Sequence, residues 1–152
     1  MKLAEALILR ADCQKRIEQL RQRLLRSAKV QEGEQPPEEP QALIAELEAT
    51  VNELTDLIKR INKTNSLTTL EDNMSITDAL AQRDTLSLKR SVYDSLVNAA
   101  AVTSNLYSRS EIKSFSTVNI TELQSQINRL SREYRELDTK IQEANWTTEL
   151  IN

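Results

Sequence analysis

The sequence contains no histidine, and it holds only one cysteine, one glycine and three prolines. Without histidine, a single chain cannot build a Ser–His–Asp triad, a Cys–His pair or a histidine-ligated metal centre. One cysteine excludes an internal disulfide and a zinc site made of four cysteines. Any catalysis would therefore depend on carboxylates, lysine, tyrosine or the backbone.

Aromatic residues make up only 3% of the 152 residues, whereas 39% are hydrophobic and 28% are charged. With so few glycines and prolines, this composition is typical of long helices joined by few turns. A core poor in aromatic rings must be filled by Leu, Ile, Val and Ala side chains. The length indicates one domain that is large enough to bury a core.

Long hydrophobic runs are also missing, because none approaches the roughly 18 residues of a membrane-spanning helix. The N-terminal apolar stretch is interrupted by Glu5 and lacks a small-residue cleavage site, so it does not fit a signal peptide. The net charge of −3 provides no overall attraction to phosphate backbones. We therefore expect a soluble cytoplasmic protein, with neither a membrane nor nucleic acid favoured as its partner.

Apolar residues recur at alternating spacings of three and four in four segments, which is the pattern of a coiled-coil seam. The segments predict helices over residues 2–28, 41–64, 76–102 and 120–145. The predicted fold is mainly α, with long antiparallel helices in a coiled-coil or four-helix-bundle-like arrangement and a small β element. Cys13 lies on the first seam, where we interpret it as a small buried hydrophobe.

Two of the predicted seams have specific consequences. The second seam, whose residues are expected to face the core, consists of Ile44, Leu47, Val51, Leu54, Ile58 and Ile61. The third contains Arg83 and Arg90, and an unpaired buried charge is very costly. These arginines must therefore reach water, pair with carboxylates or line a contact between subunits.

The small β element is predicted in two places. The turn-like cluster "EDNM" separates residues 67–70 from 74–76, and β-branched residues favour a short hairpin there. Residues 107–117 alternate in polarity and precede a helix start at Asn119. A third helix that runs away from the hairpin places 107–117 at the opposite end, and a lone strand is not stable in water. We therefore expect this strand to pair across subunits in a homo-oligomer.

Two predicted helices carry charged clusters that could form a metal site or a nucleic-acid site. The acids of the second helix, Glu46, Glu48, Glu53 and Asp56, point away from the predicted seam and fit a solvated face, so no metal site or cofactor is predicted. The first helix carries several basic residues, but they lack interleaved aromatics and adjoin an acidic loop. A role in nucleic-acid binding is therefore not favoured.

Polar residues near the ends of the predicted helices form a possible ligand site or subunit interface. Capping and hydrogen bonding between subunits explain such residues about as well as a ligand does. The candidates are Arg60, Asn62, Asn65, Arg83, Asp84, Arg90, Arg109, Glu111, Lys113, Asn145 and Trp146.

Five phrases, spread over essentially the whole chain, carry a family resemblance: "KLAEALILRAD", "AKVQEGEQPPE", "RINKTN", "YSRSEIKSFSTV" and "IQEANWTTEL". The chain resembles a bacterial family of small helical proteins that is labelled septicolysin. The resemblance implies a helical fold, and the label implies a cytolysin. It provides no catalytic residues to transfer.

Three functions follow as hypotheses. The first is a soluble, non-enzymatic helical protein that acts as a homo-oligomer. The second is a membrane-active, cytolysin-like protein, as the label implies. The third is a binder of small anionic ligands that uses the arginine and asparagine residues named above.

Overall fold

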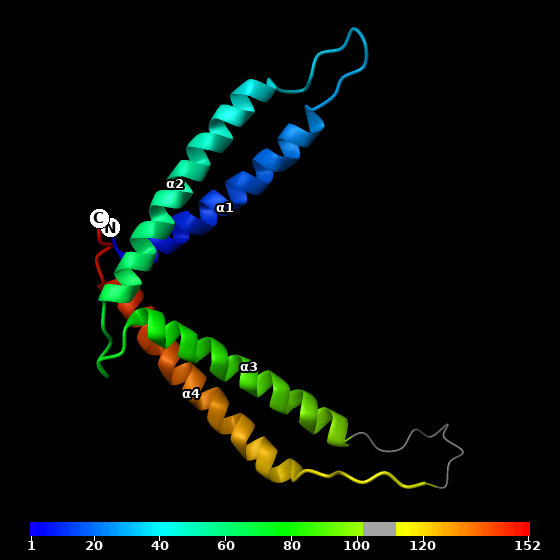
Figure 1. Cartoon of the computed structure of the whole chain (residues 1–152), viewed down its shortest axis with the longest axis vertical. Coiled ribbons are helices and arrows are strands. Elements are labelled where there is room, and N and C mark those ends of the chain that lie inside the picture. The colour runs from blue at the N-terminus through cyan, green and yellow to red at the C-terminus, as the bar shows by residue number, and fades with distance from the viewer. Residues whose placement is uncertain (102–111) are drawn as a thin grey trace. The chain divides into compact units, whose positions relative to one another are not determined.

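A computed structural model describes residues 1–101 and 112–152 of the chain, and this described part is mainly helical (Figure 1). Its helices are α1 (Leu3–Arg26), α2 (Pro40–Leu67), α3 (Ile76–Ala101) and α4 (Ile120–Thr147). These bounds agree with the predicted helices to within three residues at each end. The chain divides into two compact units: unit 1 holds Met1–Ser75 with Gln142–Asn152, and unit 2 holds Ile76–Ile141.

The seam predicted for the first helix is confirmed in unit 1. Leu3, Ala6 and Leu20 are fully buried, and Cys13 is 1% exposed. The backbone N–H of Lys2 donates to the Glu5 carboxylate at 2.6 Å, which satisfies a free donor at the start of α1. Helix α1 therefore packs against α2 along the row of residues that the heptad spacing predicted.

The seam predicted for the second helix is wrong at three positions, where the residue before the predicted one is buried instead. Ile61, its last predicted residue, is buried. The residues buried in α2 are Leu43, Thr50, Leu57, Ile61 and Thr64. By contrast, Ile44 and Ile58 are each 36% exposed, and Val51 is 41% exposed. Both rows repeat every seven residues, and the row that stays exposed is the more hydrophobic one. The chain instead buries the adjacent row, where the Thr50 hydroxyl donates to the Glu46 carbonyl at 2.8 Å and so needs no other partner.

The predicted small β element is not present in the described residues. Leu67 is the last residue of α2, and residues 67–70 and 74–76 form only an isolated bridge between Thr69 and Ser75. The Leu70 N–H donates to the Met74 carbonyl at 2.7 Å, and Asn73 adopts a positive φ of 60°. The segment is therefore a tight turn, because arms this short cannot form a hydrogen-bonded ladder.

The predicted strand 107–117 is not supported where it can be seen. Residues 107–111 lie outside the described part, and residues 112–117 form no strand. The Ser116 hydroxyl donates to the Val118 carbonyl at 2.8 Å and accepts from the Val118 N–H at 3.3 Å. Asn119 caps α4 as predicted, since its side-chain oxygen accepts from the Glu122 N–H at 3.0 Å. The alternation in 112–117 therefore reflects an extended lead into α4.

Unit 2 pairs α3 with α4 along the predicted seams. Ile127, Leu130 and Ile141 on α4 are at most 4% exposed, and Ala79 on α3 is fully buried. Small and large aliphatic side chains pack between the two helices, and Tyr93 of α3 and Tyr134 of α4 are half-buried. The helix pairs in units 1 and 2 thus each have their own apolar seam.

An ion pair holds the connection between α1 and α2. Arg23 donates to the Glu38 carboxylate through Nε at 2.9 Å, and the hydrogen bond lowers the pKa of Glu38. Glu39 starts α2 by accepting from the Gln41 N–H at 3.3 Å. The connection is therefore fixed at its α2 end by two neighbouring carboxylates.

The Arg23–Glu38 pair predicts a pH dependence of stability. Because the pKa of Glu38 is lower in the folded chain than its ordinary 4.5, the pair stabilises above that value. This stabilisation is lost as the pH falls through the lowered pKa. Glu38→Gln should therefore lower the melting temperature near pH 7, and its difference from wild type should disappear as the pH falls through the lowered pKa of Glu38. Glu32 is an exposed residue of the same connection, so Glu32→Gln should have the melting temperature of the wild type at every pH. A difference between Glu38→Gln and wild type that does not change with pH would contradict the role of the Arg23–Glu38 pair.

Candidate functional site

The end of α2 in unit 1 holds the segment that follows α4. Arg60 donates through Nε to the Ile151 carbonyl at 3.2 Å and through Nη2 to the Asn152 side chain at 3.0 Å. Lys63 donates to the Asn152 carbonyl at 3.3 Å. The Thr64 hydroxyl accepts from the Ile151 N–H at 3.0 Å. Arg60, a predicted site residue, thus binds the chain's own backbone.

The same segment is tied to the start of α1. The Leu3 N–H donates to the Thr148 carbonyl at 2.9 Å, and the Leu150 N–H donates to the Met1 carbonyl at 2.8 Å. Lys2 forms an ion pair with Glu149 at 2.6 Å, and this contact is the main reason that the pKa of Glu149 is lowered. Residues 148–152 therefore close unit 1 with backbone and charged contacts, and Leu150 is 8% exposed.

The other candidates in unit 1 differ in their surroundings. Asn62 is exposed on α2 and Asn65 is half-buried. Asn145 is 8% exposed on α4, whereas the neighbouring Trp146 is 58% exposed. Arg60 hydrogen-bonds Asn152 and the Ile151 backbone, and these are not sequence-predicted partners. The phrases "RINKTN" and "NWT" therefore lie in the same unit, but the hydrogen bonds of Arg60 go to Ile151 and Asn152 and not to Asn145.

In unit 2, the two arginines of the predicted seam differ in their exposure and in their carboxylate partners. Arg83 is 22% exposed, and its Nη1 donates to Asp138 of α4 at 2.9 Å. Asp84 adds a weaker contact at 3.5 Å. Burial opposes the charge of Arg83, but the hydrogen bond to Asp138 prevails and raises its pKa. Arg90 is 48% exposed and pairs with Asp94 one turn along α3 at 3.6 Å.

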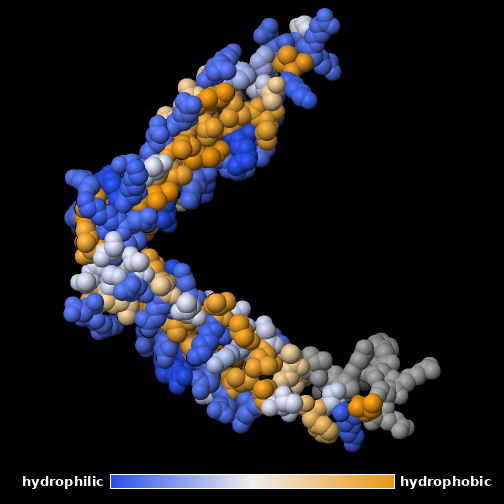
Figure 2. All heavy atoms as spheres, viewed as in Figure 1, coloured by the Kyte–Doolittle hydropathy of each residue, from blue (hydrophilic) through white to orange (hydrophobic). Residues whose placement is uncertain are grey.

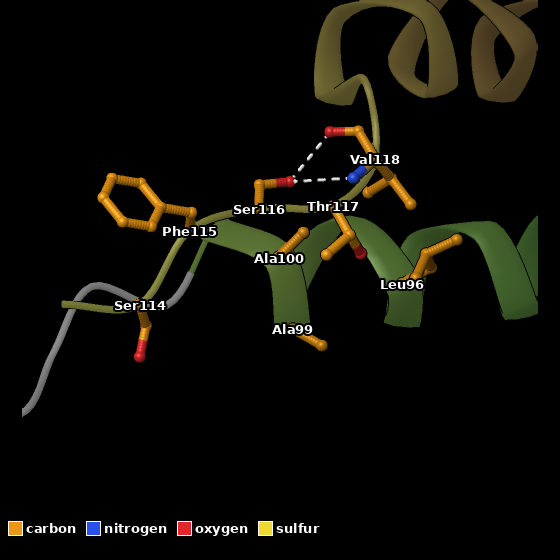
Figure 3. Close-up of a pocket in the computed structure, with 8 residues that line it drawn as sticks. All are labelled: Leu96, Ala99, Ala100, Ser114, Phe115, Ser116, Thr117 and Val118. Carbon is orange, nitrogen blue, oxygen red and sulfur yellow. Dashed lines mark hydrogen bonds between the residues drawn. The ribbon is translucent and has the colours of Figure 1, made fainter. Parts of the chain in front are cut away.

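The remaining candidates fall near the connection between α3 and α4. Arg109 and Glu111 lie outside the described residues, and Lys113 is exposed in the segment before α4. That segment lies over the end of α3 and forms an open hollow of about 270 Å³ (Figure 3). Its lining residues are Leu96, Ala99, Ala100, Ser114, Phe115, Ser116, Thr117 and Val118. None of them carries a charge, so the hollow offers no counter-ion to an anionic ligand.

Sequence reasoning missed this hollow, although one signal was present. Phe115 is the chain's single phenylalanine, and it is 82% exposed. Its ring points away from the α3 ribbon in Figure 3. An aromatic side chain in the short segment that leads into a helix is the feature that could have drawn attention to the segment.

The chemistry available in the described residues is limited. They contain no group of three acidic, cysteine or histidine side chains that could hold a metal ion. Burial is the main cause that raises the pKa of the Cys13 thiol, which keeps it protonated and weakly nucleophilic at neutral pH. Among the described helices, none is both long and apolar enough to cross a bilayer. The features of the described residues that could take part in binding therefore include ion pairs and exposed apolar surfaces.

Comparison with known proteins places the chain in a family. Residues 10–150 match a family described as "Family of unknown function (DUF6847)". A crystal structure of a functionally unknown conserved protein from Corynebacterium diphtheriae is similar at 44% identity, with a TM-score of 0.94 and 99% of each chain covered. No curated protein matches. The chain belongs to this family of unknown function, DUF6847.

Proposed function

We propose that the chain is a soluble, cytoplasmic, non-enzymatic helical protein that works as a homo-oligomer. The observation that carries the proposal is the amount of apolar side chain left exposed in regular rows. One row, called here the α2 stripe, consists of Ile44, Val51 and Ile58. In unit 2, Leu88 and Val92 of α3 are 65% and 59% exposed.

These rows are exposed because each unit contains only one pair of long packed helices. A pair of helices has one seam, so apolar residues that flank the seam keep contact with water. Figure 2 shows hydrophobic atoms running along both helix pairs on the viewed face, between hydrophilic margins. Contiguous exposed apolar surface of this kind marks an interaction site in soluble proteins. Association of copies would remove it from water.

The oligomeric state in solution tests the proposal directly. Sedimentation velocity and light scattering of the full chain, over about 1–100 µM, should give a mass above that of one chain. The mass should fall on dilution if the association is reversible. A constant mass of one chain over the whole range would reject the homo-oligomer.

The cytolysin alternative comes from the resemblance to proteins labelled septicolysin, and it has a separate test. Dye release from anionic liposomes by the purified chain would support it. Absence of binding to these vesicles at low salt would reject it, because electrostatic attraction is strongest there.

The ligand-binding alternative depends on free cationic groups. Arg60 and Arg83 already hold carbonyl and carboxylate partners, so an anion would have to compete with them. A thermal shift with inorganic phosphate or a nucleotide that is lost in Arg83→Ala would favour this function. No shift with any anion would leave these arginines a structural role.

A further inference from the structure

The outer face of α4 in unit 2 carries an open hollow of about 400 Å³, called here the arginine hollow. Its lining residues are Ser125, Gln126, Asn128, Arg129, Arg132 and Arg135. All of them are exposed except Gln126, which is half-buried. The lining contains three positive charges and no carboxylate, whereas the hollow at the end of α3 has no charged lining residue.

The three arginines are neighbours on the surface of α4. They are spaced by three residues, which is close to one helical turn. From Arg129 to Arg135 the helix rises by about 9 Å, and Arg132 lies halfway between them. Like charges on neighbouring turns of a helix repel one another. An anion bound over Arg132 would reduce this repulsion, because it would lie between the two outer guanidinium groups.

The acids of α4 leave most of this positive charge unpaired. Glu133 lies 3.9 Å from Arg129, which is a long distance for an ion pair. Glu136 is one turn beyond Arg132, but the two side chains form no ion pair. In the part of the chain that the structure describes, the side chains of Arg132 and Arg135 have neither an ion pair nor a hydrogen bond. Their guanidinium groups are therefore available to a ligand.

The two amide side chains of the hollow also have donors to offer. The Asn128 oxygen accepts from Gln124 Nε2 at 3.3 Å, and the Gln126 oxygen accepts from Arg129 Nη2. Each amide therefore uses its oxygen within α4, while its NH₂ group has no partner among the described residues. The Ser125 hydroxyl adds one more possible donor. A lining of hydrogen-bond donors with positive charge suits a ligand that is anionic and only accepts hydrogen bonds.

We infer that the arginine hollow binds a phosphate group. A guanidinium group binds phosphate through two parallel N–H···O hydrogen bonds, so Arg132 and Arg135 can each hold two of its oxygens. A phosphate monoester carries close to two negative charges and three acceptor oxygens, which suits several donors better than a single carboxylate does. The site goes beyond the proposed homo-oligomer and does not depend on it.

Thermal denaturation of the full chain with inorganic phosphate tests the site. About 20 mM phosphate should raise the melting temperature of the wild type by at least about 2 °C, relative to sodium chloride of the same ionic strength. The double variant Arg132→Gln with Arg135→Gln should lose most of this shift. Circular dichroism should show wild-type helix content in this variant, because both side chains are exposed.

Two further variants show where the phosphate acts. Lys15→Gln with Arg26→Gln removes two exposed positive charges from α1 and should keep the wild-type shift, so it controls for the loss of net charge. Arg83→Ala should also keep the shift, although its own melting temperature is lower. A shift that is lost in Arg83→Ala and kept in the double variant of α4 would overturn the inference.

The phosphate group could belong to a soluble molecule or to a lipid headgroup, and a second probe separates these sources. Vesicles of phosphatidylcholine with phosphatidic acid present a phosphate monoester at a surface. Sedimentation with these vesicles that the double variant of α4 loses, without a shift in free phosphate, would identify a headgroup as the source. A shift without sedimentation would identify a soluble phosphorylated molecule. If the wild type responds to neither probe, or if the double variant responds as the wild type does, the inference is overturned.

Discussion

Leu20→Ala should lower the free energy of unfolding by about 2–5 kcal/mol, the range for truncating a fully buried leucine. Leu20 is 0% exposed and lies on the α1–α2 seam, toward the C-terminal end of α1. A single seam has no further layer that can collapse into the cavity, so the lost contacts are not recovered. Urea denaturation followed by circular dichroism, at one protein concentration, measures the change.

Leu25→Ala is the matched control for this substitution. Leu25 is on the same helix and 66% exposed, so its truncation should change stability by no more than about 0.5 kcal/mol. Equal losses for the two variants would show that helix propensity, and not the packing of the seam, determines the stability of α1.

Asp138→Ala should destabilise unit 2 by about 1–3 kcal/mol, because it removes the main partner of a largely buried guanidinium. Arg83 would then keep only its weaker contact with Asp84 at 3.5 Å. The cost stays below that of a fully buried pair, since Asp138 is 33% exposed and water can reach the site. Thermal and urea denaturation of the two proteins provide the comparison.

Asp94→Ala tests whether the burial of Arg83 is the reason for the loss of stability expected in Asp138→Ala. Its partner Arg90 is 48% exposed, and the pair spans one turn of the same helix. Such pairs contribute about 0.3–0.5 kcal/mol, so this variant should be close to wild type. The combined variant Arg83→Met with Asp138→Ala should recover part of the loss, because no charge then remains buried. A loss equal to that of Asp94→Ala would mean that the Arg83 pair is only a surface contact.

Sequence periodicity was sufficient to find the helices but not to orient every one of them. The bounds of the four helices and the seams of α1 and α4 follow from spacing, because apolar side chains in α1 and α4 recur along one row. In α3 the predicted seam also holds Arg83 and Arg90, and Arg90 is 48% exposed. In α2, two adjacent rows repeat every seven residues, and hydrophobicity alone does not tell which row faces α1. The row with Thr50 can be buried without an unpaired hydroxyl, because this hydroxyl bonds to its own helix.

The polar candidates were harder to interpret than the helices. The place of Arg83 on the seam predicted that it would reach water, pair with a carboxylate or line a contact between subunits. The spacing on α3 does not tell which of these holds, and it does not identify Asp138 on another helix as the partner. The partners of Arg60 are even less predictable, since two of its three acceptors are a backbone carbonyl and an asparagine some ninety positions away. The alternation of 112–117 was misleading, because extended backbone before a helix start shows the same period as a strand.

The interleaving of the two units in the chain has a consequence for synthesis on the ribosome. Helix α1 and helix α2 are made before unit 2, but the contacts of Leu3 with Thr148 and of Met1 with Leu150 need residues that follow unit 2 in the chain. Unit 2 is complete once residue 141 has been made, before unit 1 can close. The α1–α2 pair of the nascent chain therefore lacks these closing contacts until residues 148–150 have been made.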